Sequence, residues 1–211
     1  MTKYEKISVL ARETAKRISA NREEWIRYLD VASRLYKYPF EDQILIYAQR
    51  PDATACASLE MWNEKMFCWV NRGAKGIALL DGESERPRLR YVFDVTDVHK
   101  AKRIGRDPFI WHLREEHKEA VPAGLEHIYG STNDSLSFES RIYEIAAGIA
   151  EDFYEEAVDE VIDAAANSFL EDLDGDVVSV RFREMLVQSV SYIVLKRCGC
   201  DMTEFADDFT F

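Results

Sequence analysis

The sequence is poor in several features that define common classes of protein. Only 5 prolines and 9 glycines occur in 211 residues, so chain breaks are few and long helices are expected. No apolar run approaches the ~18 residues that a membrane span requires, and we expect no membrane partner. The cysteines, Cys56, Cys68, Cys198 and Cys200, show no disulfide framework. Free thiols and a cytoplasmic location are therefore expected.

The usual signatures of catalysis and of cofactor binding are also missing. Neither a G-x-x-x-x-G-K-[ST] phosphate loop nor a G-x-S-x-G nucleophile motif is present. His112 and His117 are too far apart in sequence to share the helical face of a zinc protease. Cys198 and Cys200 lack the two-residue spacer of a zinc knuckle. A calcium loop that starts at Asp172 would need glycine at its sixth position and glutamate at its twelfth, where this chain has Val177 and Arg183. We expect no metal, no cofactor and no enzymatic activity.

Positive charge is scarce, and it is unevenly placed. The formal net charge is −12, but residues 1–100 hold 17 Lys and Arg against 15 Asp and Glu, and residues 101–211 hold 10 against 24. Lys and Arg provide most of the non-specific affinity for nucleic acid by neutralising phosphates. The first half can carry a local basic patch, whereas the second half would repel a phosphate backbone. The asymmetry indicates either two roles or one role that is not DNA binding.

The hydrophobic pattern predicts an α+β protein that is helix-rich, with a small antiparallel three-stranded sheet in the N-terminal half and a helical C-terminal half. We expect an α+β unit at 1–95, a linker at 96–106 and an acidic helical region at 107–211. Helices are predicted at 3–19, from 21 until Pro39, at 40–49, 107–120, 136–170 and 179–197, with one helical turn at 59–65. Strands are predicted at 67–70, 76–81 and 89–95, and a loop with a possible short helical piece at 122–130.

The densest functional pattern is the run from Trp62 to Leu80. Its Arg72–Gly76 turn, R-G-A-K-G, places two cations and two flexible backbone positions beside Trp62 and Trp69. A binder of unpaired nucleic acid needs this combination, because cations attract phosphates and aromatic rings stack on exposed bases. The alternative interpretation is a β-hairpin with a solvated tip and tryptophans in the core.

A second pair of candidate nucleic-acid-binding residues, Gln49 and Arg50, comes just before Pro51 at a predicted helix end. The planar guanidinium of Arg50 can hold a phosphate. It can equally serve as a helix cap that pairs with the negative end of the helix dipole.

The long helix predicted at 136–170 carries an acidic face. Its carboxylates are Glu151, Asp152, Glu155, Glu156, Asp159, Glu160 and Asp163. Carboxylate metal sites in helical bundles also need a histidine three residues after a glutamate, and none occurs here. Two interpretations stay open, a solvated helix face and a row of anions that imitates a phosphate backbone and binds a partner protein.

The run Trp62–Leu80 and the preceding run Tyr38–Thr54 together carry a resemblance. They resemble the N-terminal, single-strand-binding domain of ArdC-type antirestriction proteins, a segment also found at the front of large helicase- and methylase-bearing proteins of conjugative elements. The similarity covers roughly Asn21 to Val95. The matching residues are Trp25, Tyr28, Tyr38, Phe40, Gln43, Leu45, Ile46, Gln49, Arg50, Pro51, Thr54, Trp62, the turn 72–77, and Phe93, Asp94 and Val95. The chain departs from that pattern at Glu41-Asp42, where many relatives have Asn-Asn, and it lacks the H-E-x-x-H metalloprotease part.

The resemblance implies a mobile-element protein that protects incoming DNA from host defence. The leading hypothesis is a non-enzymatic binder of single-stranded DNA in which Trp62 and Trp69 stack on bases and Arg50, Arg72 and Lys75 hold phosphates. One alternative is an inhibitor, similar in role to an anti-CRISPR protein, that binds a host DNA-targeting defence nuclease through the acidic helices. Another is a docking module of a larger conjugation protein.

Overall fold

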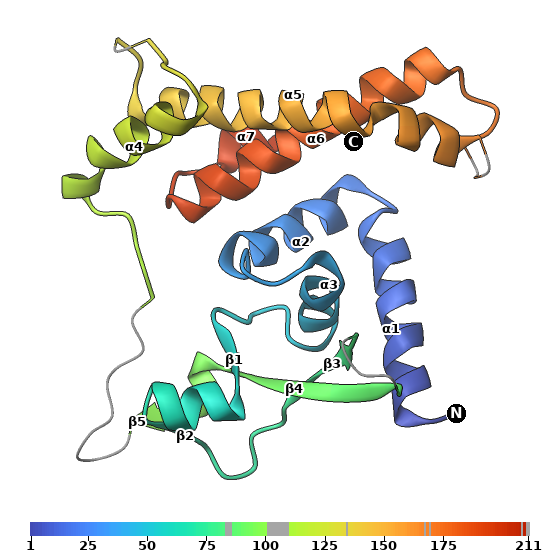
Figure 1. Cartoon of the computed structure of the whole chain (residues 1–211), viewed down its shortest axis with the longest axis vertical. Helices are drawn as coiled ribbons and strands as arrows, with labels where there is room; N and C mark the ends of the chain where they lie inside the picture. The colour runs from blue at the N-terminus through green and yellow to red at the C-terminus, as the bar shows by residue number, and fades with distance from the viewer. Residues whose placement is uncertain are drawn as a thin grey trace. The chain divides into compact units, whose positions relative to one another are not determined.

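The computed structural model describes residues 1–82, 86–100, 110–133, 135–166, 168, 170–207 and 209. The chain forms two compact units, Met1–Trp111 and His112–Phe211. The first contains three helices and two small sheets, and the second contains helices alone among its described residues (Figure 1). The predicted α+β class, with its three-stranded antiparallel sheet in the first half and its helical second half, is confirmed.

Three helices pack together on one side of the strands in the first unit (Figure 1). They are α1 Lys3–Ile18, α2 Arg22–Arg34 and α3 Phe40–Gln49. The Asn21 carboxamide caps α2 by accepting a hydrogen bond from the Glu24 N–H at 3.0 Å, as the sequence predicts. The core between these helices and the strands is built from fully buried aliphatic side chains, among them Leu29, Leu45 and Leu79. α2 ends at Arg34, earlier than predicted, and a turn leads to Pro39 at the start of α3.

The main sheet has the order β1-β4-β3 and is antiparallel throughout. Its strands are β1 Cys56–Ser58, β3 Ile77–Asp81 and β4 Arg88–Asp94. The predicted strands at 76–81 and 89–95 are thus present as neighbours, in a register that pairs Ala78 with Tyr91. The third strand is β1, a short segment that the sequence pattern does not reveal.

The predicted strand at 67–70 exists as β2 Cys68–Val70, but its expected hairpin with β3 is wrong. β2 pairs instead with β5 Val98–Lys100, in a separate two-stranded ribbon where Trp69 lies opposite His99. The 3₁₀ turn η2 Val95–Asp97 leads from β4 to β5. Asn71 N–H then donates to the Asp97 carbonyl at 2.8 Å and extends the ribbon by one more contact. Residues 96–100 therefore belong to the first unit rather than to a linker, and 101–106 lie outside the described residues.

A π-helical turn, η1 Met61–Lys65, joins β1 to β2 where one helical turn was predicted. The Met66 N–H donates to the Met61 carbonyl, five residues earlier, at 3.1 Å. π-helical turns are rare and occur frequently at functional sites.

The second unit is an antiparallel pair of long helices with shorter helices beside it. Its elements are η3 Glu115–His117, α4 Ala120–Tyr129, α5 Phe138–Ala165, α6 Gly175–Arg197 and α7 Thr203–Asp207. The Tyr154 and Ser179 hydroxyls are 2.6 Å apart between α5 and α6. Arg141 on α5 donates to both carboxylate oxygens of Glu126 on α4 at 2.7 Å. None of the described helices combines the length and the hydropathy of a membrane span.

Two predictions for this unit differ from the structure, one for residues 122–130 and one for residues 107–120. The loop expected at 122–130 is mainly helix α4, since Pro122 occupies the first turn, where its missing N–H has no helical partner to lose. Gly130 ends α4 with a φ of +105°, the left-handed conformation that glycine adopts at helix ends. The helix expected at 107–120 falls partly outside the described residues, and 110–114 are not helical.

The close approach of β3 to β4 predicts an asymmetric response to alanine at two glycines. A Cβ at Gly76 would lie 3.1 Å from Phe93 Cζ and 3.2 Å from two atoms of Tyr91, whereas a Cβ at Gly82 meets nothing within 4 Å. Gly76→Ala should lower the free energy of unfolding by roughly 1 kcal/mol, because overpacking outweighs the lost chain entropy. Gly82→Ala should be neutral or stabilising by up to about 1 kcal/mol. Urea denaturation compares them, and equal midpoints would contradict this packing.

Candidate nucleic-acid interface

Trp62, one of the two predicted stacking residues, belongs to the core. It is only 4% exposed, and its indole N–H donates to the Phe93 carbonyl at 2.9 Å. The prediction that both indoles face solvent is therefore wrong for Trp62. A buried tryptophan needs a partner for its single N–H, and the end of β4 provides that partner, which fastens η1 to the sheet.

Gln49 is exposed, but its side-chain amide forms hydrogen bonds with the backbone of the first unit. Its Nε2 donates to the carbonyls of Ala78 at 2.8 Å and of Leu45 at 2.9 Å, while its Oε1 accepts from the Ala78 N–H at 3.0 Å. β3 is an edge strand. The two hydrogen bonds between Gln49 and Ala78 satisfy backbone groups that would otherwise be open to pairing with another strand. The amide is therefore not available for a nucleic acid in this structure.

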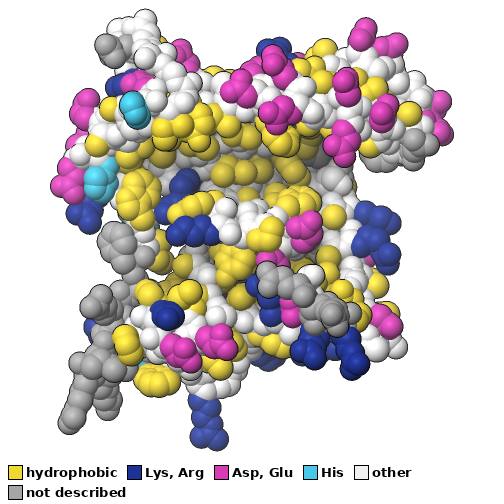
Figure 2. All heavy atoms as spheres, viewed as in Figure 1, with side chains coloured by type: hydrophobic (Ala, Val, Ile, Leu, Met, Phe, Trp, Pro, Cys, Tyr) yellow, Lys and Arg dark blue, Asp and Glu magenta, His cyan; other side chains and the backbone are white. Residues whose placement is uncertain are grey.

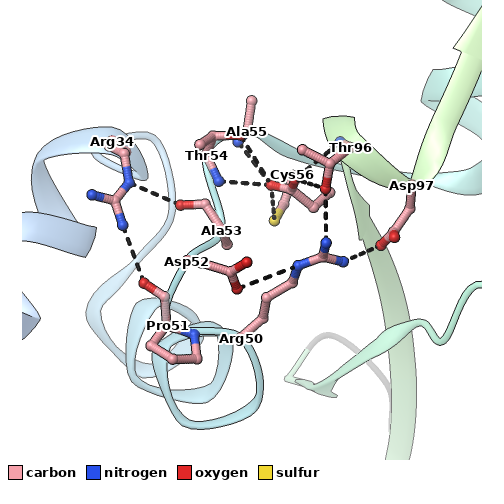
Figure 3. Close-up of polar contacts among 11 residues, drawn as sticks. Arg34, Arg50, Pro51, Asp52, Ala53, Thr54, Ala55, Cys56, Thr96 and Asp97 are labelled. Atoms are coloured by element: carbon pink, nitrogen blue, oxygen red, sulfur yellow. Dashed lines mark hydrogen bonds and ion pairs between the residues drawn. The ribbon is translucent and has the colours of Figure 1, made fainter.

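Arg50, the predicted phosphate ligand, is also bound to internal partners (Figure 3). Its guanidinium forms an ion pair with Asp97, donates to the Thr96 hydroxyl at 2.7 Å and lies 3.7 Å from an oxygen of Asp52. The alternative interpretation was a cap at the end of the helix. Only the Arg50 backbone acts in this way, since its N–H donates to the Ile46 carbonyl at 2.7 Å. The side chain joins the end of α3 to the β4–β5 turn.

Asp94 is the centre of the same network, and it is 0% exposed. Its Oδ2 accepts from the N–H groups of Thr54 at 2.7 Å and Ala55 at 3.1 Å, and its Oδ1 accepts from the N–H and hydroxyl of Thr96 at 3.0 and 2.7 Å. Burial alone would raise the pKa of Asp94. These four hydrogen bonds outweigh burial, and they hold the pKa below its ordinary value. Asp94 is therefore ionised at neutral pH although it is inaccessible.

Arg34 braces the loop between α3 and β1 from its other side (Figure 3). Its guanidinium donates to the carbonyls of Ala53 at 2.9 Å and Pro51 at 3.2 Å. Thr54 and Asp94 both belong to the residues that carry the family resemblance, but a functional reading of the sequence assigned them no role. A threonine after a helix end and an aspartate at a strand end are the signals that could have pointed to this network.

One departure from the resemblance is explained by an internal ion pair. Asp42, which stands in the Glu41-Asp42 position, is 4% exposed and forms an ion pair with Arg90 on β4. Burial raises the pKa of Asp42 in spite of that ion pair. The carboxylate therefore holds α3 to the sheet and adds little negative charge to the outer surface.

Trp69 is the predicted stacking residue that the structure places at the surface. Its side chain is 48% exposed, and Phe67, two residues earlier, is 40% exposed. Arg72 and Lys75, also exposed, make no ion pair or hydrogen bond within the described part of the chain. We call Trp69, Arg72 and Lys75 the Trp69 surface. All three side chains are exposed, and their role in binding stays a prediction.

His99 lies beside the Trp69 surface and adds a polar group to it. The sequence does not reveal this position, because His99 falls in the segment 96–106, for which a linker is predicted. Directly opposite residues of an antiparallel pair project from the same face of a ribbon, so His99 and Trp69 lie side by side. His99 Nδ1 lies 2.7 Å from the Asn71 side-chain oxygen. Because a carboxamide oxygen only accepts, Nδ1 carries the hydrogen, and Nε2 is the ring nitrogen left for another partner.

The backbone leading into β2 is strained. Phe67 has a φ of +53°, which is unusual for any residue but glycine and costs of the order of 1 kcal/mol or more. It follows directly on η1. Such conformations cluster at ligand-binding sites. Here the strained residue, Phe67, and Trp69, two residues later, both expose an aromatic side chain.

The acidic face predicted on the long helix lies on α5. Glu151 is paired with Arg183 of α6 at 2.7 Å. Five exposed carboxylates make no ion pair or hydrogen bond with the described residues, namely Asp152, Glu155, Glu156, Asp159 and Glu160. With Glu151 and Asp163 they cover about half of the helix circumference over roughly 18 Å of axis, given 100° and 1.5 Å per residue.

The charge asymmetry follows the division into units. The first unit has 20 Lys and Arg against 16 Asp and Glu, and the second has 7 against 23. Figure 2 shows Asp and Glu side chains spread over the visible face of the helical unit and Lys and Arg gathered on the other. Nowhere among the described residues do three or more His, Cys, Asp or Glu side chains gather as a metal site would require.

No protein-family model matches the chain, and comparison with curated proteins and with solved structures finds no significant match.

The Asp94 network predicts a loss of stability and a characteristic pH dependence. In Asp94→Asn an NH₂ group replaces one carboxylate oxygen and leaves at least one buried donor unpaired, at roughly 1–3 kcal/mol per group. Because the folded pKa of Asp94 is lowered, its stabilisation is complete above the unfolded value of about 3.9 and is lost as pH falls through the folded pKa. The free energies of unfolding of wild type and variant should therefore converge below about pH 4.

Asp52→Asn is the matched control, because the Asp52 side chain is 81% exposed and lies 3.7 Å from Arg50 Nε. It should change the free energy of unfolding by less than about 0.5 kcal/mol. Urea denaturation between pH 2.5 and 7 measures all three proteins. An Asp94→Asn variant as stable as Asp52→Asn would contradict the assigned role of Asp94.

Proposed function

We propose that this protein is a non-enzymatic binder of single-stranded DNA and that it binds through the Trp69 surface. The observation that carries the proposal is the exposed indole of Trp69, followed within six residues by two cations that have no partner among the residues the structure describes. Unpaired bases offer their faces to an aromatic ring, whereas the bases of a duplex are already stacked. The surface therefore favours a single strand.

The residues of the Trp69 surface determine the strength of binding, its salt dependence and its sequence preference. Stacking of a base on one aromatic side chain contributes about 1–3 kcal/mol and is tolerant of sequence. Arg72 and Lys75 add two phosphate contacts, so binding weakens as salt rises. Glu60 and Glu64, at the start of η1 and within it, are exposed carboxylates that repel phosphates and so reduce the total binding free energy. The result is a moderate, salt-sensitive affinity with little preference for base sequence.

The biological role follows from the resemblance to the ArdC N-terminal domain. A protein of this kind, encoded on a mobile element, would cover a DNA strand that enters a new cell and protect it from host defence. It would act in the cytoplasm. The matching residues Gln49, Arg50 and Trp62 bond to other groups of the first unit, which supports a shared framework, and the Trp69 surface supplies the contact.

The Trp69 surface predicts which substitutions weaken binding. Trp69→Ala should weaken binding of labelled dT20 by roughly 5- to 150-fold, the equivalent of one stacked base. Arg72→Ala with Lys75→Ala should weaken binding and reduce the slope of log K against log salt by about 1.4, since each single-strand phosphate contact contributes about 0.7. Fluorescence anisotropy at several salt concentrations measures both quantities.

Two control variants match these changes elsewhere on the first unit. Tyr36→Ala removes an aromatic side chain that is 51% exposed, and Lys6→Ala with Lys16→Ala removes two exposed cations from α1. Duplex DNA of the same length should bind more weakly than dT20. The proposal fails if dT20 does not bind, or if the Trp69 surface variants behave like these controls.

A second candidate function is favoured by the five unpaired carboxylates of α5. One carboxylate occurs about every 3 Å of helix axis, within a factor of two of the charge spacing of duplex DNA. Such a face suits a basic, DNA-binding groove on another protein. The candidate is inhibition of a host DNA-targeting nuclease, in which α5 occupies the groove in place of DNA.

This candidate predicts that inhibition depends on the charge of α5 alone. The variant with Asp152, Glu155, Glu156, Asp159 and Glu160 changed to their amides should lose inhibition of DNA cleavage by a purified CRISPR nuclease. A control with five exposed carboxylates of the first unit neutralised, namely Glu13, Glu23, Glu41, Glu60 and Glu64, should retain it. Raising the DNA concentration should relieve inhibition, and inhibition that DNA cannot relieve would contradict a shared groove.

A further inference from the structure

A second aromatic side chain, Tyr91 on β4, lies directly against the end of the basic turn. The residue is 38% exposed. A Cβ at Gly76 would lie 3.2 Å from both Cβ and Cδ1 of Tyr91, so the backbone that follows Lys75 passes close to this side chain. The pairing of Ala78 with Tyr91 across β3 and β4 fixes that position. Residues 69–76 therefore form one continuous segment that begins at Trp69 and ends at Gly76, beside Tyr91.

A cation accompanies Tyr91 as well. The ammonium of Lys3, at the start of α1, lies 4.9 Å from the centre of the Tyr91 ring. Lys3 is exposed, and it forms no ion pair with an acid in the described part of the chain. Tyr91 and Lys3 therefore repeat the combination of ring and unpaired cation found at Trp69, although they come from different elements.

We propose that Tyr91 and Lys3 form a second nucleotide contact, and that the basic turn joins it to Trp69 so that one DNA strand spans both. This inference rests on the proposed function and extends its site. The ligand class is unpaired nucleic acid several nucleotides long. Charge complementarity selects this occupant, because Lys3, Arg72 and Lys75 all lack an acidic partner among the described residues.

The position of Lys3 over the ring is compatible with this role. An exposed cation–π contact contributes about 0.5–1 kcal/mol, whereas a base stacked on an aromatic ring contributes about 1–3 kcal/mol. A base can therefore displace the ammonium from the ring. The flexible four-carbon stem of lysine then lets the ammonium move to the phosphate of the same nucleotide.

The length of the segment sets the length of the ligand. Seven residue steps separate Trp69 from Gly76, which span at most roughly 25 Å when fully extended. The actual path is shorter, because Ala74 N–H donates to the Asn71 carbonyl at 3.0 Å and closes a turn. The span fits the lower part of the ~4–16 nucleotides that one small single-strand-binding domain covers.

The test compares a short and a long oligonucleotide. Labelled dT2 is too short to bridge the two contacts, and dT12 can reach both, so wild type should bind dT12 far more tightly. Tyr91→Ala should reduce that gain from dT2 to dT12 by at least roughly fivefold, whereas Tyr91→Phe retains the ring and the gain. Lys3→Met, which lies outside the core, should lower the salt slope for dT12 by about 0.7.

The outcomes separate this inference from the proposed function. The inference is overturned if Trp69→Ala weakens dT12 binding but Tyr91→Ala and Lys3→Met match the Tyr36→Ala control. If wild type binds neither oligonucleotide, the proposed function itself fails. Tyr91→Phe and Lys3→Met keep the test decisive even where Tyr91→Ala lowers stability, which thermal unfolding of each variant records.

Discussion

The structure of the first unit depends on the buried carboxylate of Asp94. It gathers the N–H groups of Thr54, Ala55 and Thr96 around one point at the end of β4. Arg50 extends the network to Asp97, and Asp97 in turn accepts a backbone hydrogen bond from Asn71. The chain must therefore turn after β4 and run back as β5 beside β2. That turn places Trp69 and His99 opposite each other on one face of the ribbon.

The residues that suggested nucleic-acid binding fall into two groups. Gln49, Arg50 and Trp62 satisfy internal donors and acceptors, and each fastens one element to another. Trp69 lies on β2, and Arg72 and Lys75 lie on the segment between β2 and β3. Within the part of the chain that the structure describes, their side chains make no hydrogen bond or ion pair. The residues of the family resemblance thus serve the framework more than the contact. A framework of this kind can keep its shape while the exposed ring and cations adapt to a ligand.

Much of the fold was predictable where local signals and tertiary structure agree. Helix α3 begins after Pro39 and ends at Gln49 as predicted, and α5 and α6 follow from their long apolar patterns. β5 was not predictable, because the tripeptide V-H-K has no pattern that distinguishes a strand from a linker. Helix α4 was predicted only as a short helical piece inside a loop, because proline and glycine mark a helix start and a helix end as readily as they mark a loop.

The candidate site was predictable only in part, for a related reason. Whether a tryptophan stacks on a ligand or fills a core depends on a partner far away in sequence, and Trp62 finds the Phe93 carbonyl thirty-one residues later. Trp69 alternates with the buried Cys68 along β2, so its outward direction follows from the strand period once the strand is known. The role proposed for Tyr91 depends on its position beside Gly76, which the sequence alone does not reveal.

The central claim is that Trp69, and not Trp62, meets the bases of a bound strand. The most direct measurement is intrinsic tryptophan fluorescence on addition of saturating dT20 to wild type, Trp69→Phe and Trp62→Phe. Stacked bases quench an indole, so the decrease in emission should disappear in Trp69→Phe and persist in Trp62→Phe. A decrease that persists in Trp69→Phe and disappears in Trp62→Phe would contradict the account.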